Sequence, residues 1–133
     1  MRYTILIAII AIFMANNAKS DTNCVNELVY HEARNQSFLG QIAVVNVAYN
    51  RAAKSGKSVC KEIYKPYQFS FHNGGYTPAM TDKEALKLAE RAAFVGRYID
   101  VTDGANYYNR TELGLRRGAK NKRVIGQHVF YKI

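Results

Sequence analysis

The sequence has no tryptophan, only two prolines and only two cysteines, and it is short of acidic residues. Its 10 Asp and Glu residues stand against 19 Lys and Arg residues, which gives a formal net charge of +9 at pH 7. The scarcity of proline and the lack of any low-complexity tract argue against a disordered or linker-rich chain. A length of 133 residues leaves room for one domain with one hydrophobic core.

Several motifs of catalysis and cofactor binding are also missing. No glycine-rich phosphate-binding loop is present, and no serine lies in the context of a nucleophile elbow. The three histidines, His31, His72 and His128, are scattered, and none lies at metal-ligand spacing beside a cysteine. We therefore expect neither a metal ion nor a cofactor.

The N-terminal segment differs in composition from the rest of the chain. Met1-Arg2 gives a positive start, Tyr3 to Ala15 is an uncharged and mostly apolar run, and the small residues Ala18 and Ser20 follow it. This pattern is typical of a cleaved signal peptide over residues 1–20. As a helix the apolar run rises about 20 Å, which is short for a hydrocarbon core of about 30 Å. A releasable signal-anchor is the alternative.

Residues 21–133 are then expected to form a single exported domain, located in the periplasm or outside the cell. A basic excess favours anionic partners such as nucleic acid, membrane surfaces or the bacterial envelope. Because a signal segment directs the chain out of the cytoplasm, we predict no nucleic-acid partner and no stable membrane insertion after cleavage. The densest basic cluster comprises Arg116, Arg117, Lys120, Lys122 and Arg123. A solvated loop explains this cluster equally well.

The two cysteines, Cys24 and Cys60, both lie in the exported part. An even number of cysteines in an exported chain favours a disulfide, because that environment is oxidising. Two free buried thiols are the alternative that the pattern leaves open.

Hydrophobic spacing predicts an α+β domain with more helix than strand. Helices are predicted over residues 23–34, 38–53 and 82–99, and a short helix is predicted to start at Ser58. The helix over 38–53 is apolar on most of its sides. We therefore expect it to be the central buried element.

The strand predictions are weaker, because the segments are short. Strands are predicted over residues 68–71, 105–109 and 124–132, with the basic cluster in a loop between the last two. Thr81 and Glu84 have the spacing of a capping box, so Thr81 is the predicted cap of the helix over 82–99.

Glu32 is the acidic residue whose position differs most from that of a solvated charge. It follows the apolar face of the first predicted helix and precedes the break at Asn35-Gln36-Ser37, so it lies at an element end. Apolar surroundings favour the neutral form of a carboxyl group, which a general acid requires. From the pattern alone, an ion pair with Arg34 or Arg51 explains Glu32 at least as well as catalysis does.

Motif blocks along the chain resemble the SleB/CwlJ-type family of cell-wall hydrolases, which includes spore cortex-lytic enzymes and phage and proteobacterial relatives. The blocks are Tyr30–Arg34, Gly40–Arg51, Val59–Tyr64, Gln68–Ser70, Gly104–Asn109 and Ile125–Tyr131. They follow the family's order and cover nearly all of residues 21–133. The sequence departs from the family at Phe71, where Trp is expected, and at Leu113–Arg117, which replaces a Pro-Pro-Trp stretch.

The resemblance implies a compact lysozyme-like fold related to lytic transglycosylases, in which Glu32 is the catalytic acid and Cys24 pairs with Cys60. It implies an enzyme that binds peptidoglycan strands and cleaves the β-1,4 bond between MurNAc and GlcNAc. No second carboxylate stands out near the motif blocks, so we expect Glu32 to act as acid and then base, as in a lytic transglycosylase. A catalytically inactive peptidoglycan-binding or structural envelope protein of the same fold is the alternative.

The substrate contacts expected around the acid are Gln68, Ser70, Tyr107, Tyr108 and His128. Gln68 and Ser70 offer hydrogen bonds to sugar hydroxyl or N-acetyl groups, and a tyrosine ring offers a flat face to a pyranose. Side chains alternate along a strand, so only one of Tyr107 and Tyr108 is expected to face the cleft. A structural hydrogen bond explains His128 better than catalysis does. We expect the domain to be a monomer.

Overall fold

The computed structural model describes residues 23–72 and 75–133. The predicted signal segment over residues 1–20 therefore lies outside the described residues. A first helix is described over residues 23–33. It is followed by α2 (Phe38–Ser55), α3 (Val59–Ile63), the 3-10 turn η1 (Ser70–His72), α4 (Lys83–Tyr98), β1 (Tyr107–Arg110), the 3-10 turn η2 (Thr111–Leu113), β2 (Lys120–Ile125) and β3 (His128–Lys132).

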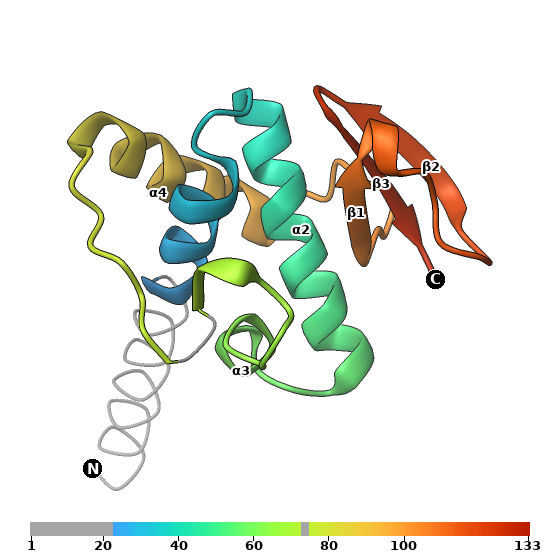
Figure 1. The fold of residues 1–133 in the computed structure, drawn as a ribbon, viewed down its shortest axis with the longest axis horizontal. Coiled ribbons are helices and arrows are strands. Elements are labelled where there is room, and N and C mark those ends of the chain that lie inside the picture. Colours follow the sequence, from blue (N-terminus) through green and yellow to red (C-terminus); the bar gives the residue numbers. More distant parts are fainter. Residues whose placement is uncertain (1–22, 73–74) are drawn as a thin grey trace, which may run out of the picture.

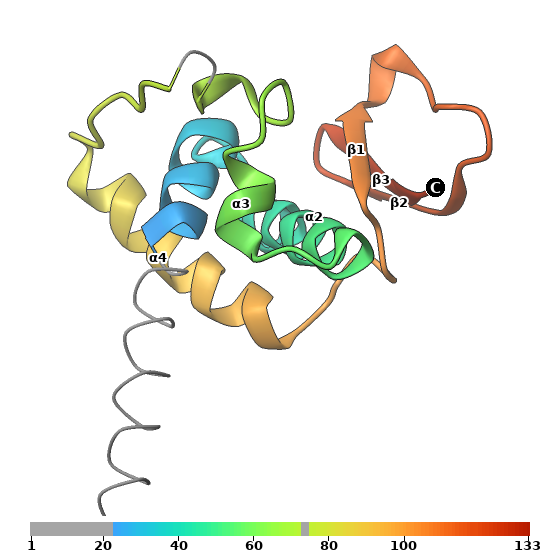
Figure 2. The ribbon, with the colours of Figure 1, turned by 90° about the horizontal axis from the view of Figure 1, so that it is seen from below.

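The long helix α2 is the centre of the molecule, with the other helices packed around it and the small sheet beside it (Figures 1 and 2). Every residue from Gly40 to Ala48 is buried, which confirms the predicted central helix. The Ser37 side chain caps the helix by accepting a hydrogen bond of 3.2 Å from the Gly40 N–H. At the other end Gly56 adopts a left-handed conformation with φ of 68°, which terminates the helix.

The helices α2 and α4 approach each other closely at Gly96. A Cβ atom at this position would lie 2.5 Å from Cγ1 of Val45 and 3.2 Å from the backbone oxygen of Ile42. Since real Cβ atoms do not tolerate such contacts, glycine permits the crossing. The small buried residues Ala89, Ala92 and Ala93 continue the same face of α4.

A disulfide between Cys24 and Cys60 joins the first helix to α3, so the predicted bridge is present in the structure. The two cysteines are 36 residues apart in the sequence. In the loop-entropy account, closing a loop of this length stabilises the fold by about 3 to 4 kcal/mol. The bridge thereby holds α3, and the loop after it, against the helical part.

The sheet has three antiparallel strands in the order β1-β3-β2. The prediction of one strand over residues 124–132 is wrong, because Gly126 adopts φ of 60° and turns the chain between β2 and β3. The placement of the basic cluster in a loop is also wrong in part, since Lys120, Lys122 and Arg123 belong to β2. As an exposed edge strand β2 lacks the alternation that marks a half-buried strand, and charges suit such an edge.

Two further local predictions are wrong. Residues 68–71 do not form a strand, since Tyr67 adopts φ of 64° and a 3-10 turn begins at Ser70. This segment has no neighbouring strand to pair with, as the described sheet consists of β1 to β3. The cap of α4 is Asp82 rather than Thr81, because the Asp82 carboxylate accepts the hydrogen bond of the Ala85 N–H at 3.0 Å.

Within residues 23–72 and 75–133, no helix has both the length and the apolar character needed to span a membrane.

Candidate active site

The carboxyl group of Glu32 lies where three parts of the chain meet. Glu32 is half-buried in the last turn of the first helix. The Ser70 hydroxyl of η1 donates a hydrogen bond to Oε1 at 3.2 Å, and the Tyr108 hydroxyl of β1 donates to Oε2 at 3.4 Å. Both bonds are long for O–H···O contacts, so they orient the carboxyl group without enclosing it.

The ion pairs described in the structure are Lys87–Glu84 and Arg110–Glu112. Among the described residues, therefore, Glu32 has no ion pair with Arg34 or Arg51, the alternative that the sequence left open. Arg34 lies over the ring of Tyr30 instead, at 5.0 Å from the centroid. The Glu32 carboxyl is held by hydroxyl groups rather than by a cationic side chain.

Tyr108 is the residue that connects Glu32 to the sheet. Burial and the negative charge of Glu32 raise the pKa of the Tyr108 hydroxyl well above its usual value. The hydroxyl therefore keeps its proton and stays a donor to Glu32. The Tyr108 ring is fixed by stacking on Phe130 at 5.5 Å and by an edge contact with His128 at 5.2 Å.

His128 lies next to Tyr108 and is only 9% exposed. Its Nδ1 is buried and has no hydrogen-bond partner among the described residues. Burial and the nearby positive charge of Arg110 lower the pKa of His128, which keeps the ring neutral. His128 does not line the groove described next, and its ring packs edge-on against that of Tyr108.

A groove of ≈ 400 Å³ lies between β1 and the loop that leads to η1. Its lining residues are Arg51, Pro66, Tyr67, Gln68, Tyr107, Tyr108, Asn109 and Arg116. Tyr108 belongs to this lining and donates to Glu32, so it connects the groove to the carboxyl group. Gln68 is held in place because its Oε1 accepts a hydrogen bond of 3.0 Å from Nη1 of Arg51.

Both tyrosines of β1 line the groove, although alternation along a strand places successive side chains on opposite faces. The reason is that β1 is an edge strand of the sheet. A groove that runs along the edge of a sheet is reached by side chains from both of its faces. Tyr107 stacks on Tyr131 at 6.0 Å, while Tyr108 stacks on Phe130, and each ring still borders the groove.

Polar side chains of α2 hold β1 in position. Arg51 donates from Nε to the backbone oxygen of Asn106 at 2.6 Å, as expected for a structural arginine, and burial lowers the pKa of its guanidinium. Asn50 donates to the backbone oxygen of Ala105 at 2.9 Å. Asn46 is buried and bonds Ile99 and Val101 in the connection from α4.

These two asparagines were missed by the sequence analysis, although a signal for them existed. Asn46 and Asn50 are four residues apart on a helix that is otherwise apolar there. A buried amide on an apolar helix needs hydrogen-bond partners, and irregular backbone nearby supplies them. Their spacing therefore marks the face of α2 that anchors the chain before β1.

Other side chains with catalytic potential are engaged elsewhere in the described part of the chain. His31 Nε2 lies 3.0 Å from the backbone oxygen of Pro78, and His72 Nδ1 lies 2.8 Å from the Thr77 hydroxyl. Both cysteines are in the disulfide. Among the described residues, no group of three or more His, Cys, Asp and Glu side chains is close enough to hold a metal ion.

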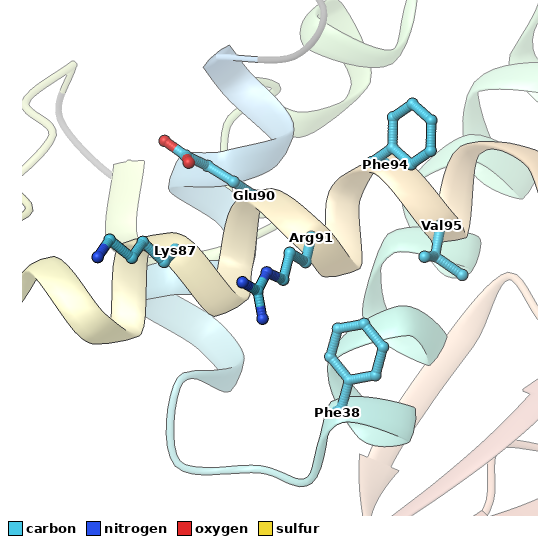
Figure 3. A pocket seen from close by; sticks show the side chains of 6 residues that line it. All are labelled: Phe38, Lys87, Glu90, Arg91, Phe94 and Val95. Atoms are coloured by element: carbon cyan, nitrogen blue, oxygen red, sulfur yellow. The ribbon is translucent and has the colours of Figure 1, made fainter.

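A larger hollow of ≈ 550 Å³ lies between α4 and the start of α2. Figure 3 shows its lining, which consists of Phe38, Lys87, Glu90, Arg91, Phe94 and Val95. It shares no lining residue with the groove. None of its side chains has a described hydrogen bond to Glu32, so its size alone does not mark it as the site of chemistry.

The cell wall hydrolase family matches residues 35–131. The chain belongs to this family. As a cell wall hydrolase it is an enzyme that degrades peptidoglycan, which confirms the predicted class. The matched span begins after Glu32, so the role of Glu32 rests on the contacts described above.

Two solved structures resemble this cell wall hydrolase over most of its length. The catalytic domain of the germination-specific lytic transglycosylase SleB from Bacillus anthracis has a TM-score of 0.69 and 25% identity, covering 84% of this chain and 93% of its own. The catalytic domain of Bacillus cereus SleB has a TM-score of 0.67 and 26% identity, covering 86% and 91%. These matches confirm the predicted SleB-type family and lysozyme-like α+β fold. No curated protein matches the chain significantly.

Proposed function

We propose that this cell wall hydrolase is a lytic transglycosylase that cleaves the β-1,4 bond between MurNAc and GlcNAc, with Glu32 as its single acid and base. The observation that carries this proposal is that Ser70 and Tyr108 orient the Glu32 carboxyl, while the groove that Tyr108 lines has no Asp or Glu among its described lining residues. The likeness to a domain named as a lytic transglycosylase supports the same reaction.

Glu62 is the nearest alternative for a second carboxylate, because it lines a hollow of ≈ 300 Å³ that adjoins the groove at Arg51, Gln68 and Tyr107. Only 4% of its surface is exposed, and its Oε2 accepts a hydrogen bond from the Ser55 hydroxyl at 3.1 Å. A base that activates water must meet the sugar ring from the face opposite the acid. A buried carboxylate bonded to α2 does not suit that task.

The reaction with one carboxyl group proceeds in two proton transfers. Protonated Glu32 gives its proton to the glycosidic oxygen, and the bond from this oxygen to C1 of MurNAc breaks with oxocarbenium character. The resulting carboxylate then removes the proton of the C6 hydroxyl of the same sugar. The C6 oxygen bonds to C1 and closes a 1,6-anhydro ring, so no water is consumed and Glu32 returns to its starting form.

The residues around Glu32 divide into two groups in this proposal. Ser70 and Tyr108 donate to the carboxyl group, so both are positioning residues here, although both were predicted to contact the substrate. Gln68 and Tyr107 line the groove and offer an amide and an aromatic face to the glycan. Their arrangement suits a strand of sugars that lies along the edge of β1.

The protein must be exported to reach its substrate, since peptidoglycan lies outside the cytoplasm. Residues 1–20 act as the signal segment, and residues 21–133 form the secreted catalytic domain, which acts as a monomer. N-terminal sequencing of the protein recovered from the cell envelope is expected to start at Asp21. A chain that keeps Met1 would instead support the signal-anchor.

The decisive test compares Glu32→Gln with Glu27→Gln on purified peptidoglycan sacculi. Both residues lie in the first helix, and Glu27 accepts the hydrogen bond of the Tyr64 hydroxyl at 2.5 Å, away from the groove. Removing a general acid costs about a hundredfold or more in rate, so Glu32→Gln should release almost no soluble fragments. Glu27→Gln should keep activity within about twofold.

Thermal unfolding and sedimentation with sacculi complete this test. Both variants should melt within a few degrees of the wild type, because an amide replaces a carboxyl group of the same shape. Undiminished lysis by Glu32→Gln would rule out the proposed acid. A wild type that binds sacculi and releases nothing would favour the inactive binding protein.

A further inference from the structure

Arg116 lies in the connection between η2 and β2, far from the motif that carries Glu32 in the sequence. Its side chain is exposed, yet its guanidinium lies over the ring of Tyr107 at 5.0 Å from the centroid, and it lines the groove. It takes part in neither of the ion pairs found in the described residues. Stacking on an aromatic ring holds an exposed guanidinium in place while its N–H groups stay available.

The charged side chains that line the groove near Arg116 are all positive. Tyr107 is contacted by a second guanidinium, that of Arg51, at 4.9 Å. The lining thus contains two arginines and, among its described residues, no Asp or Glu. Like charges so close together repel each other, and an anion bound at Arg116 relieves that repulsion. The site therefore favours a substrate that brings a negative group into the groove.

The proposed substrate supplies such a group at regular intervals. Each MurNAc residue has a lactyl group on O3, whose carboxyl is free in a bare glycan strand and extends into a stem peptide in intact peptidoglycan. Stem peptides in turn contain free carboxylates. A planar guanidinium matches a carboxylate with two parallel N–H···O bonds, so either source offers the same chemistry to Arg116.

We propose that Arg116, held on the ring of Tyr107, binds a carboxylate of the muramyl substituent and makes the enzyme select glycan strands in which that carboxylate is free. This inference rests on the proposed function, because it takes the glycan to lie in the groove beside Glu32. The inference assigns specificity to a residue of the connection between η2 and β2.

The test uses three substrates. The first is native sacculi, and the second is sacculi whose stem carboxylates have been converted to neutral amides with carbodiimide and ammonia. The third is glycan freed of its stems by an amidase, which leaves the lactyl carboxylate exposed. Steady-state cleavage and the binding of soluble fragments are both measured, so that a binding effect is seen even without turnover.

Arg117 provides a matched control, because it is the next residue and is also exposed but does not line the groove. Loss of one charge-assisted contact reduces affinity about tenfold. We therefore expect Arg116→Gln to raise KM about tenfold on native sacculi with kcat little changed. Amidation of the sacculi should not raise the KM of Arg116→Gln further. For the wild type, amidation of the sacculi should raise KM about tenfold, and Arg117→Gln should behave like the wild type.

The third substrate identifies the source of the carboxylate. If the KM of Arg116→Gln exceeds that of the wild type about tenfold on stem-free glycan, the bound group is the lactyl carboxylate. If this difference appears only on native sacculi, the bound group is a carboxylate of the stem peptide. Equal losses in Arg116→Gln and Arg117→Gln would overturn the inference. So would a wild type that is indifferent to amidation and that also binds stem-free glycan no better than Arg116→Gln does. Binding that depends on Arg116 without any cleavage would support the inference and contradict the proposed function.

Discussion

Two junctions of the molecule are built on different principles. The junction between α2 and α4 is closed by small apolar residues, and at Gly96 it has no space for one additional carbon atom. The junction around Glu32 joins the first helix, η1 and β1 through two long hydrogen bonds to a half-buried carboxyl group. The first junction fixes where the elements lie, and the second leaves a reactive group oriented but accessible.

The difference shows how a small domain separates stability from catalysis. Dense packing in the helical part holds the elements rigidly, so the groove needs few contacts of its own. Substitutions at the packed junction should therefore change the free energy of unfolding with little effect on the chemistry. Substitutions around Glu32 should do the reverse.

The largest effect of this kind is expected for Gly96→Ala. The new methyl group would lie 2.5 Å from Cγ1 of Val45, and such overpacking costs about 1 to 3 kcal/mol in the free energy of unfolding. Urea unfolding measures this loss, while the specific activity of the folded protein should stay within about twofold. The double variant Gly96→Ala/Val45→Ala should recover part of the loss, and a single variant as stable as the wild type would contradict the packing account.

Tyr108→Phe is expected to lower activity rather than stability, and by a smaller amount. The hydroxyl donates one long hydrogen bond to Glu32, and a single hydrogen bond contributes about 1 kcal/mol, or about fivefold in rate. We expect kcat to fall by about that factor with the unfolding free energy nearly unchanged. Tyr98→Phe is the control, because Tyr98 is an exposed tyrosine of α4. An equal fall in both variants would show that Tyr108 has no specific role.

The smallest effect concerns pH and His128. Burial and Arg110 hold the pKa of His128 below its ordinary value in the folded protein, so the unfolded chain binds a proton more readily. Stability should therefore fall as the pH drops below about 6.5, and should level off below the lowered pKa. Urea unfolding at a series of pH values should show a smaller fall for His128→Gln than for the wild type. An equal fall would assign the pH dependence to other groups.

The sequence predicted the parts of the fold that depend on local pattern. The helix α2, its burial and the bridge between Cys24 and Cys60 were all expected, because periodicity and an exported pair of cysteines are local or compositional signals. The strand β2 was missed for a physical reason, since it is exposed along its length and has no alternating apolar face. Gly126 was the sequence signal for the turn between β2 and β3.

The candidate site was predictable only in part. Glu32 was found through its motif, but the pattern alone gave no reason to prefer catalysis over an ion pair with an arginine. Its contacts with Ser70 and Tyr108 join residues 38 and 76 positions away, which no local pattern reveals. The same holds for Arg116 over Tyr107, where a basic loop residue reaches the groove across the strand edge.

The most direct test of the account is the mass of the sugar ends that the enzyme produces. A single carboxyl group that acts first as acid and then as base leaves 1,6-anhydro-MurNAc ends, which are lighter by one water molecule than reducing MurNAc ends. Mass spectrometry of fragments released from purified sacculi by the wild type should show anhydro ends throughout. Reducing ends throughout would contradict the account, because a second group would then have to activate water.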